Sequence, residues 1–283
     1  MATSATSDQL LVVIDPVARR TDGESVRIAK DVLSAGATTK VCMPEGPDEF
    51  ARVLARRGAR RPVVVGDDRA LLRAVSLLHR QRELAGCALS FVPVGGALSV
   101  ARSLGVPTGA VAAARTVLDG VERRLDLLVD DSDGVVLGAL RIPAVAPQPP
   151  EMEAEAEAAG RPWLRTCQTL VRTLVPARPT REPAPPAPGP SRLRVEVDGV
   201  TLVDLGQPVE AVSVTPGVAG LAEVEVRPVS VGAEASLLRA SGRTVTVTGA
   251  DFRYRADAGV AGPVRRRTWT VWEGALGLTL PGR

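Results

Sequence analysis

The chain has 283 residues, of which 45% are hydrophobic and 24% are charged, so it can form two cores of ordinary size and is not wholly disordered. Only 2% of the residues are aromatic and the formal net charge is +3, which argues against a nucleic-acid partner. Three scattered cysteines and one histidine, His79, argue against a disulfide framework, a cysteine-based zinc site and any site built from several histidines.

The first part of the chain alternates short apolar runs with amphipathic stretches. The runs predict buried parallel strands, since they are apolar on both faces: 10–15, 38–43, 62–67, 89–94 and 125–130. The stretches have apolar residues at three-and-four spacing and predict helices: 24–35, 48–57, 70–84, 98–104 and 109–118. Asp48 and Thr108 stand at predicted N-cap positions. We therefore predict a three-layer α/β domain with a mostly parallel sheet over residues 1–130.

The rest of the chain differs in composition. Residues 143–190 combine closely spaced glutamates with many prolines, which predicts a mobile acidic and proline-rich linker that contains a short amphipathic helix over 163–175. Residues 191–283 alternate apolar with polar positions between Gly, Pro and Asp turns, which predicts an antiparallel β-sandwich domain. The apolar run near the N-terminus is too short to cross a bilayer and no basic stretch precedes it, so we expect a cytoplasmic protein.

Three turns follow strands of the predicted parallel sheet. They contain Asp15–Pro16, Gly66–Ala70 and Pro93–Leu98. Ligands of such sheets bind beyond the carboxyl ends of the strands, so we expect the turns to form one anion pocket from backbone amides. Each turn taken alone is also typical of an ordinary connection from a strand to a helix. Their shared position at one edge is what indicates a site.

In this order and at these separations, the turns resemble the three sequence blocks of the diacylglycerol kinase catalytic domain, a family of lipid kinases. The likeness in organisation covers almost the whole chain. A late turn matches the family's Asp-Gly-Glu motif at Asp257, with Ala258 and Gly259 in place of Gly and Glu. The other matching residues are Pro16, Gly66, Asp68, Pro93, Gly95, Ala101 and Arg102.

The resemblance implies a nucleotide-kinase-like N-terminal domain that transfers phosphate from ATP to a lipid hydroxyl with Mg²⁺. Asp68 and Asp257 would then be catalytic, and Asp68 would hold the metal. The implied nucleotide-binding residues are Pro16, Gly66, Asp67, Arg69, Pro93, Gly95, Gly96 and Arg102. The implied partners are a nucleotide and either a lipid or the inner membrane surface, where the protein would lie peripherally. A homodimer stays open.

The departures from the family pattern affect the phosphate-binding turns. Asp67 replaces a glycine, and a carboxylate about 4 Å from a phosphate would cost on the order of 4 kcal/mol at an effective dielectric constant of about 20. Leu98 and Ala70 replace residues whose side chains would contact the nucleotide, phosphate or metal. We therefore expect phosphoryl transfer to be impaired or lost, as in a pseudokinase. An active lipid kinase and an unrelated small-molecule enzyme on the same sheet plan are the alternatives.

Overall fold

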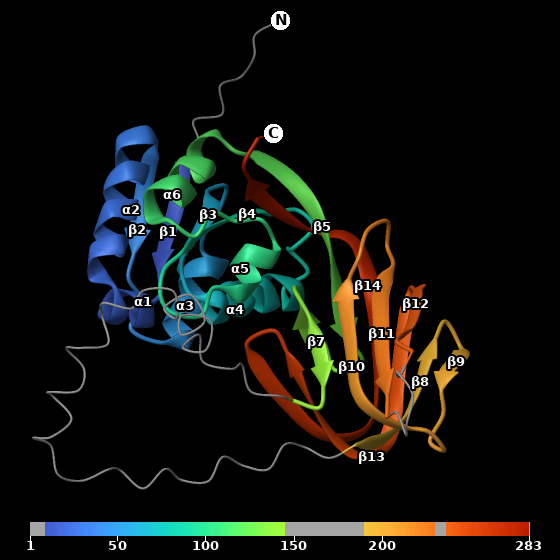
Figure 1. The fold of residues 1–283 in the computed structure, drawn as a ribbon. Coiled ribbons are helices and arrows are strands. Elements are labelled where there is room, and N and C mark those ends of the chain that lie inside the picture. Colours follow the sequence, from blue (N-terminus) through green and yellow to red (C-terminus); the bar gives the residue numbers. More distant parts are fainter. Residues whose placement is uncertain (1–8, 145–189, 230–235, 283) are drawn as a thin grey trace, which may run out of the picture. The chain divides into compact units, whose positions relative to one another are not determined.

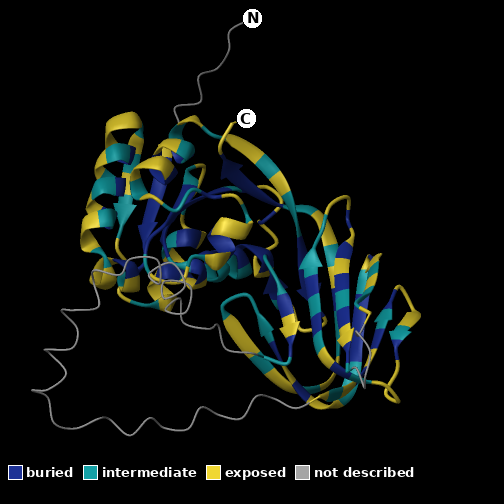
Figure 2. Ribbon diagram, in the orientation of Figure 1, coloured by how far each residue is buried: buried dark blue, intermediate teal, exposed yellow. Residues whose placement is uncertain are grey.

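The computed structural model describes residues 9–144, 190–229 and 236–282. The N-terminal region is a mixed α/β structure of parallel β–α units, as predicted (Figure 1). Its parallel strands lie in the order β2-β1-β3-β4. They are β1 (Gln9–Ile14), β2 (Thr38–Cys42), β3 (Arg61–Gly66) and β4 (Ala88–Pro93). Apart from their first residues, β1, β3 and β4 are buried along their whole length (Figure 2).

Helices cover both faces of the parallel strands. They are α1 (Pro16–Thr21), α2 (Gly23–Gly36), α3 (Pro47–Ala55), α4 (Asp68–Arg80), α5 (Ser99–Ser103) and α6 (Ala110–Asp119). One core joins α2 and α6 to the face of β1 that carries Val12, and another joins α3, α4 and α5 to the face that carries Val13. Successive residues of a strand point to opposite faces, so a run that is apolar at every position needs both layers.

The predicted N-caps were wrong. Helix α3 begins at Pro47 after Gly46, and α6 begins after Gly109, and neither helix has a side-chain cap. Proline at the first helical position needs no capping partner, because it has no backbone N–H. Helices α1, α2 and α4 are each capped by an aspartate that directly precedes the helix: Asp15, Asp22 and Asp67.

The parallel direction predicted for residues 125–130 was also wrong. Strand β5 (Val121–Asp130) runs antiparallel to β14 (Gly259–Leu280). The end of β14 returns to the first sheet and pairs in parallel with β4, with Leu278 beside Leu89. Ser90 Oγ donates a hydrogen bond of 2.8 Å to Thr279 Oγ1 there. An apolar run reveals burial but not the direction of the neighbouring strand, so the sequence pattern could not show this pairing.

The C-terminal region is an antiparallel barrel rather than the predicted sandwich. Its other strands are β6 (Val135–Val136), β7 (Leu140–Ile142), β8 (Ser191–Val197), β9 (Val200–Val203), β10 (Pro208–Pro216), β11 (Ala222–Pro228), β12 (Leu238–Gly242) and β13 (Thr244–Ala256). Both β10 and β13 pair with β7 and with β8, which closes the sheet. Alternating burial predicts one inner face, but it does not distinguish a closed sheet from two packed sheets.

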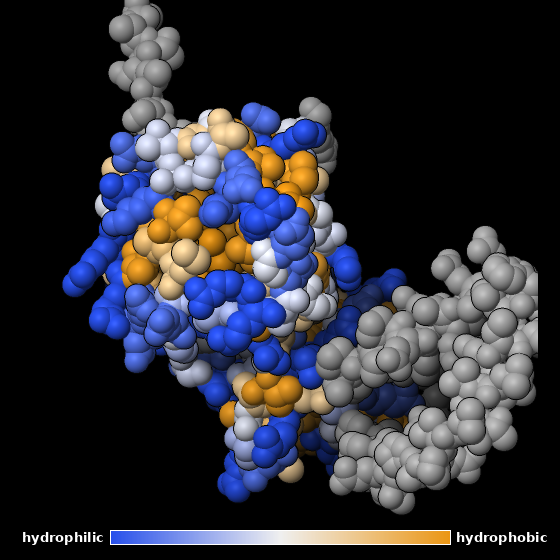
Figure 3. Space-filling view, turned by 90° about the vertical axis from the view of Figure 1, so that its left-hand side faces the viewer, coloured by the Kyte–Doolittle hydropathy of each residue, from blue (hydrophilic) through white to orange (hydrophobic). Residues whose placement is uncertain are grey.

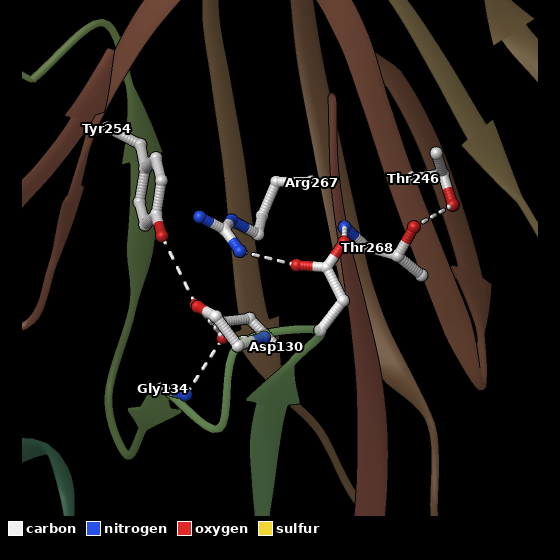
Figure 4. Close-up of polar contacts among 8 residues, drawn as sticks. Asp130, Gly134, Thr246, Tyr254, Arg267 and Thr268 are labelled. Carbon is white, nitrogen blue, oxygen red and sulfur yellow. Dashed lines mark hydrogen bonds and ion pairs between the residues drawn. The ribbon is translucent and has the colours of Figure 1, made fainter. Parts of the chain in front are cut away.

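A polar network fixes one end of the barrel (Figure 4). Tyr254 donates through its hydroxyl to Asp130 Oδ2 at 3.2 Å, and the Gly134 amide donates to Asp130 Oδ1 at 2.8 Å. Arg267 Nη1 donates a hydrogen bond of 2.5 Å to Asp131 Oδ1. Burial opposes the charge of Asp130, but the hydrogen bonds from Gly134 and Ser132 outweigh it, so the pKa of Asp130 lies below its ordinary value. The network ties the turn after β5 to β13 and β14.

Strand β2 ends the parallel sheet, and no strand within the described ranges pairs with its outer edge. Figure 3 shows the side of the molecule that carries α2 and β2, where apolar residues gather inside a ring of hydrophilic ones. An open edge of this kind can accept a further strand. The homodimer nevertheless stays a prediction.

The predicted linker falls largely outside the described residues. This applies to the acidic and proline-rich stretch and to the helix expected over 163–175, since both lie within residues 145–189. The domain division at residues 130, 143 and 191 stays a prediction. Among the helices of the described ranges, none is long and apolar enough to cross a membrane.

Candidate functional site

The three turns predicted to lie together are joined by backbone hydrogen bonds. Asp15 N donates to Val65 O at 2.9 Å, which links the first turn to the end of β3. Val94 N donates to Gly66 O at 2.7 Å, and Asp68 N donates to Ala97 O at 2.9 Å. We call this edge the rim: residues 15–16, 66–70 and 93–98. The expectation that these turns share one edge of the sheet agrees with the structure.

Two rim glycines have positions that a larger residue would strain. A Cβ atom added to Gly66 would lie 2.6 Å from Ala70 Cβ and 3.0 Å from Asp15 Cβ, closer than real contacts allow. Gly95 has φ +119°, which L-residues rarely adopt. Gly66 therefore lets the first turn approach the start of α4, whereas Gly95 lets the chain after β4 turn with a positive φ. This packing role is enough to account for them without any ligand.

Asp67 caps helix α4. Its Oδ1 accepts hydrogen bonds from the amides of Arg69 and Ala70, each at 3.1 Å. The start of a helix is where backbone amides would bind a phosphate. Here those two amides are already bonded to a carboxylate of the chain itself.

Asp68 binds the first amides of helix α5 in the same way. Its side chain is fully buried and accepts hydrogen bonds from Ser99 Oγ at 3.1 Å, Val100 N at 2.9 Å and Ala101 N at 3.1 Å. The two adjacent aspartates therefore bond to the beginnings of two different helices. Both carboxylate oxygens of Asp68 already have partners.

Asp257 lies at the tip of the β13–β14 hairpin, in a backbone conformation with φ +50°. Its half-buried carboxylate accepts three amide hydrogen bonds, from Leu137 at 2.7 Å, Gly138 at 2.7 Å and Ala139 at 2.9 Å. Burial raises the pKa of Asp257 above its ordinary value; the three amides act against this, and the charge of nearby Asp68 adds to the rise. The structure thus brings the two predicted catalytic aspartates within electrostatic reach of each other.

These aspartates do not fit Mg²⁺. A magnesium ion needs carboxylate oxygens that can approach it at about 2.0–2.1 Å in an octahedral shell that also holds water. Asp68 is inaccessible, and the oxygens of Asp257 face backbone amides. Across the described residues, no three His, Cys, Asp or Glu side chains are arranged to hold a metal ion.

The sequence pattern gave no role to two residues that organise the rim. Asp15 is 2% exposed, and its Oδ1 caps α1 through Val17 N at 2.8 Å. Its Oδ2 accepts a hydrogen bond of 2.6 Å from Arg73 Nη1. Arg73 also lies over the ring of Phe50, with 5.5 Å from its Cζ to the ring centroid. Asp15 could have been suspected from its place beside Pro16, whereas Arg73 looked like any other polar residue of a helix.

The other predicted nucleotide-binding residues lie at or near the rim. Pro16 begins α1, Pro93 ends β4, and Gly96 is exposed in the turn after β4. Arg69 projects exposed from the first turn of α4. Arg102 is exposed in the last turn of α5.

A groove of about 510 Å³ lies between α4 and the tip of the β13–β14 hairpin. Helix α4 contributes Arg69, Leu72, Arg73 and Ser76, which share one stripe of the helix, and the hairpin contributes residues 258–260. We call it the α4–hairpin groove. It adjoins the rim through Arg69 and the hairpin tip through Ala258.

Comparison with known proteins supports the fold but gives no match in sequence. No protein-family model matches the chain, and no curated protein matches it. Two structures provisionally described as a diacylglycerol kinase from Bacillus anthracis str. Sterne match with a TM-score of 0.67 and 14% identity, over 96% of this chain and 97% of theirs. A third structure, of a diacylglycerol kinase from the same organism, matches with a TM-score of 0.66 and 12% identity over the same shares. The predicted resemblance is thereby confirmed as a likeness of fold.

Proposed function

We propose that this chain is a pseudokinase: a protein with the diacylglycerol kinase fold that binds a ligand or partner and does not transfer phosphate. One observation carries the proposal. The carboxylates of Asp67 and Asp68 accept hydrogen bonds from the first amides of α4 and from amides of α5, at the edge of the sheet where a nucleotide phosphate would have to bind. The anion sites of the rim are filled by the chain itself.

A phosphate would compete poorly for these amides. The hydrogen bonds from these amides to Asp67 and to the buried Asp68 would have to be broken before the phosphate could form its own. Displaced but still nearby, the Asp67 carboxylate would also repel the phosphate. Because Asp68 is inaccessible and the oxygens of Asp257 face backbone amides, we derive no catalytic step that depends on a metal.

An active lipid kinase is the second candidate, and one observation favours it. Asp68 and Asp257 lie close enough for the charge of one to raise the pKa of the other, as in a site that uses two acids. In that case ATP and Mg²⁺ would be the cofactors and a lipid hydroxyl the acceptor. The protein would then act at the inner membrane surface.

Phosphoryl transfer can be tested directly. The purified protein is incubated with γ-labelled ATP, Mg²⁺ and extracted membrane lipid, beside Asp257→Asn and a diacylglycerol kinase of known activity as the positive control. We expect no label in the lipid fraction from this protein. Label that appears with the wild type and disappears with Asp257→Asn would overturn the proposal and establish the second candidate.

A thermal shift experiment tests nucleotide binding separately from transfer. A ligand at one hundred times its dissociation constant would add about 2.7 kcal/mol to the stability, which is easily measured. With millimolar ATP and Mg²⁺ we expect no change in the melting temperature of the wild type. A saturable rise would show that the rim amides bind phosphate in spite of Asp67.

A further inference from the structure

Helix α4 ends in a turn that normally contains glycine, but here the residue is an arginine. Arg82 N donates to His79 O and Glu83 N donates to Leu78 O, each at 2.9 Å. These two bonds close the helix with Arg82 in the left-handed region, at φ +59°. Glycine is usual at this position, because a residue with a Cβ atom is strained there.

Helix α5 ends in the same kind of turn with the usual residue. Gly105 N donates to Arg102 O at 3.0 Å, and Gly105 has φ +78°. Val106 N donates to Ala101 O at 2.9 Å, which completes the same pair of bonds. The turn itself therefore does not require an arginine at position 82, and the chain accepts at Arg82 a strain that it avoids at Gly105.

The Arg82 side chain makes no polar contact that would offset this strain. It is exposed, and no hydrogen bond or ion pair joins its guanidinium to another residue of the described ranges. A positive charge near a helix C-terminus complements the helix dipole. Arg80 already supplies that charge from the last turn of α4. A strained residue whose charged group has no partner inside the protein points to a partner outside it.

Other arginines surround this turn. Glu83 Oε2 accepts a hydrogen bond of 2.5 Å from Arg57 Nη1, which joins the end of α4 to the end of α3. Arg60 N in turn donates to Arg57 O at 3.3 Å. We call this group the arginine edge: Arg56, Arg57, Arg60, Arg80 and Arg82. Among the described residues, Arg57 is the one member of the group with an ion pair.

The acids near the arginine edge do not neutralise it. Glu83 is bonded to Arg57. Asp133 lies 3.8 Å from His79 Nε2, beside the last turn of α4. Glu122 is bonded at 2.9 Å to an arginine outside the group. The other guanidinium groups of the edge have no carboxylate partner in the part of the chain that the structure describes, so the charge of this surface is positive.

Carboxylates fit this surface better than a bilayer or a nucleic acid does. A planar guanidinium can bind a carboxylate through two parallel hydrogen bonds. No large apolar side chain between residues 51 and 90 is exposed, so the edge has neither an anchor that would enter a membrane nor an aromatic surface on which a base could stack.

We infer that the arginine edge binds a carboxylate-rich segment of a partner protein and that Arg82 is one of its contacts. The inference goes beyond the proposed function, because it does not depend on the rim. Helix α4 begins at the rim with Asp68 and has 13 residues, so its end lies about 20 Å away. The strain at Arg82 places a guanidinium at the surface that glycine could not supply.

Fluorescence anisotropy with a labelled peptide of ten glutamates tests this binding. We expect the peptide to bind at about 50 mM salt, to dissociate at about 500 mM salt, and to bind far more tightly than a peptide of ten glutamines. Equal binding of the two peptides, or no binding of the glutamate peptide, would overturn the inference. Tighter binding to vesicles that contain phosphatidylglycerol than to the glutamate peptide would also overturn it, in favour of a membrane surface.

Matched variants separate the charge of Arg82 from its strain. Arg82→Gly should weaken the glutamate peptide about fivefold, the upper end for an exposed ion pair, while it raises the melting temperature by about 2 °C. Ala219→Gly relieves the same kind of strain at φ +57° in the barrel, so it should raise the melting temperature similarly and leave peptide binding unchanged. Arg253→Ala removes an exposed arginine from β13 and should also leave peptide binding unchanged.

Two results with Arg82→Gly would contradict the inference. If this variant bound the glutamate peptide as tightly as the wild type, Arg82 would not be a contact. If it melted below the wild type, the arginine would be supporting the fold and its strain would need no partner. Label transferred from ATP to lipid, in contrast, would remove the pseudokinase proposal and leave the inference about the arginine edge standing.

Discussion

The rim and the α4–hairpin groove are neighbours with opposite arrangements of charge. At the rim, Asp67 and Asp68 are bonded to backbone amides of the chain. In the groove, Arg69 is exposed, and Arg73 is only partly neutralised by Asp15. The comparison shows that a charged residue at a binding edge has two distinct uses. It can replace a ligand, as the aspartates do, or it can remain accessible to one.

Removing the buried acid of the rim should have the largest effect. Asp68→Ala should lower the free energy of unfolding by about 3 kcal/mol, because two buried amides and a hydroxyl lose their acceptor. Urea unfolding followed by circular dichroism measures this loss. Asp31→Ala, which removes an exposed partner of Arg27 on α2, should change the stability little. If the two variants lost the same amount, Asp68 would not hold the rim together.

A substitution in the barrel, away from the rim and the α4–hairpin groove, should have a smaller effect on the free energy of unfolding. Tyr254→Phe removes a hydroxyl that donates to Asp130 but keeps the ring that packs edge-on against Trp269 at 5.2 Å. We expect a loss of about 1 kcal/mol in the free energy of unfolding, with no change in ligand binding. A loss no larger than that of Asp31→Ala would show that the hydrogen bond from Tyr254 to Asp130 does not contribute to stability.

Two acids should affect the pH dependence of stability with opposite signs. Burial raises the pKa of Asp257, so its contribution to stability is present below the unfolded-chain pKa of about 4 and is lost as the pH rises through the raised pKa. The pKa of Asp130 is lowered by hydrogen bonds that outweigh burial, so its contribution is present above about pH 4 and is lost as the pH falls.

These signs can be measured with asparagine variants, by urea unfolding between about pH 3 and pH 7. The stability difference between the wild type and Asp257→Asn should shrink as the pH rises. The difference between the wild type and Asp130→Asn should shrink as the pH falls. The same slope for both variants would contradict the opposite environments that the structure gives these two carboxylates.

Removing the Asp67 carboxylate from the rim should lower the free energy of unfolding least. Asp67→Gly should lose only a few tenths of a kcal/mol, since glycine is itself acceptable at an N-cap. It frees the amides of Arg69 and Ala70, so inorganic phosphate should now stabilise the protein against heat. Asp22→Gly removes the cap of α2 and should lose similar stability without gaining a response to phosphate. Equal responses in both variants would indicate a general salt effect.

The sequence predicted the parallel sheet well, because a run such as Val12–Val13–Ile14 can be buried on both faces only between two layers. It could not predict the direction of β5 or the return of β14 to β4. The pairing of Leu278 with Leu89 joins distant segments, and no local pattern records it.

The candidate site was predictable in position but not in chemistry. The rim turns follow strand ends, and parallel strands bring such ends together. Asp67 and Asp68 look alike in the sequence, yet Asp67 caps its own helix, whereas Asp68 reaches a helix about thirty residues further along the chain. Arg73 belongs to the groove only because the hairpin of the barrel packs opposite α4.

The rim amides themselves give the most direct test of the central claim. In ¹⁵N-labelled protein, the amide resonances of Arg69, Ala70, Val100 and Ala101 can be followed by nuclear magnetic resonance while ATP and Mg²⁺ are added. We predict that all four stay unchanged, because each amide already donates to an aspartate of the chain. Shifts of these four resonances that saturate together would show that nucleotide displaces the aspartates, and would contradict the account.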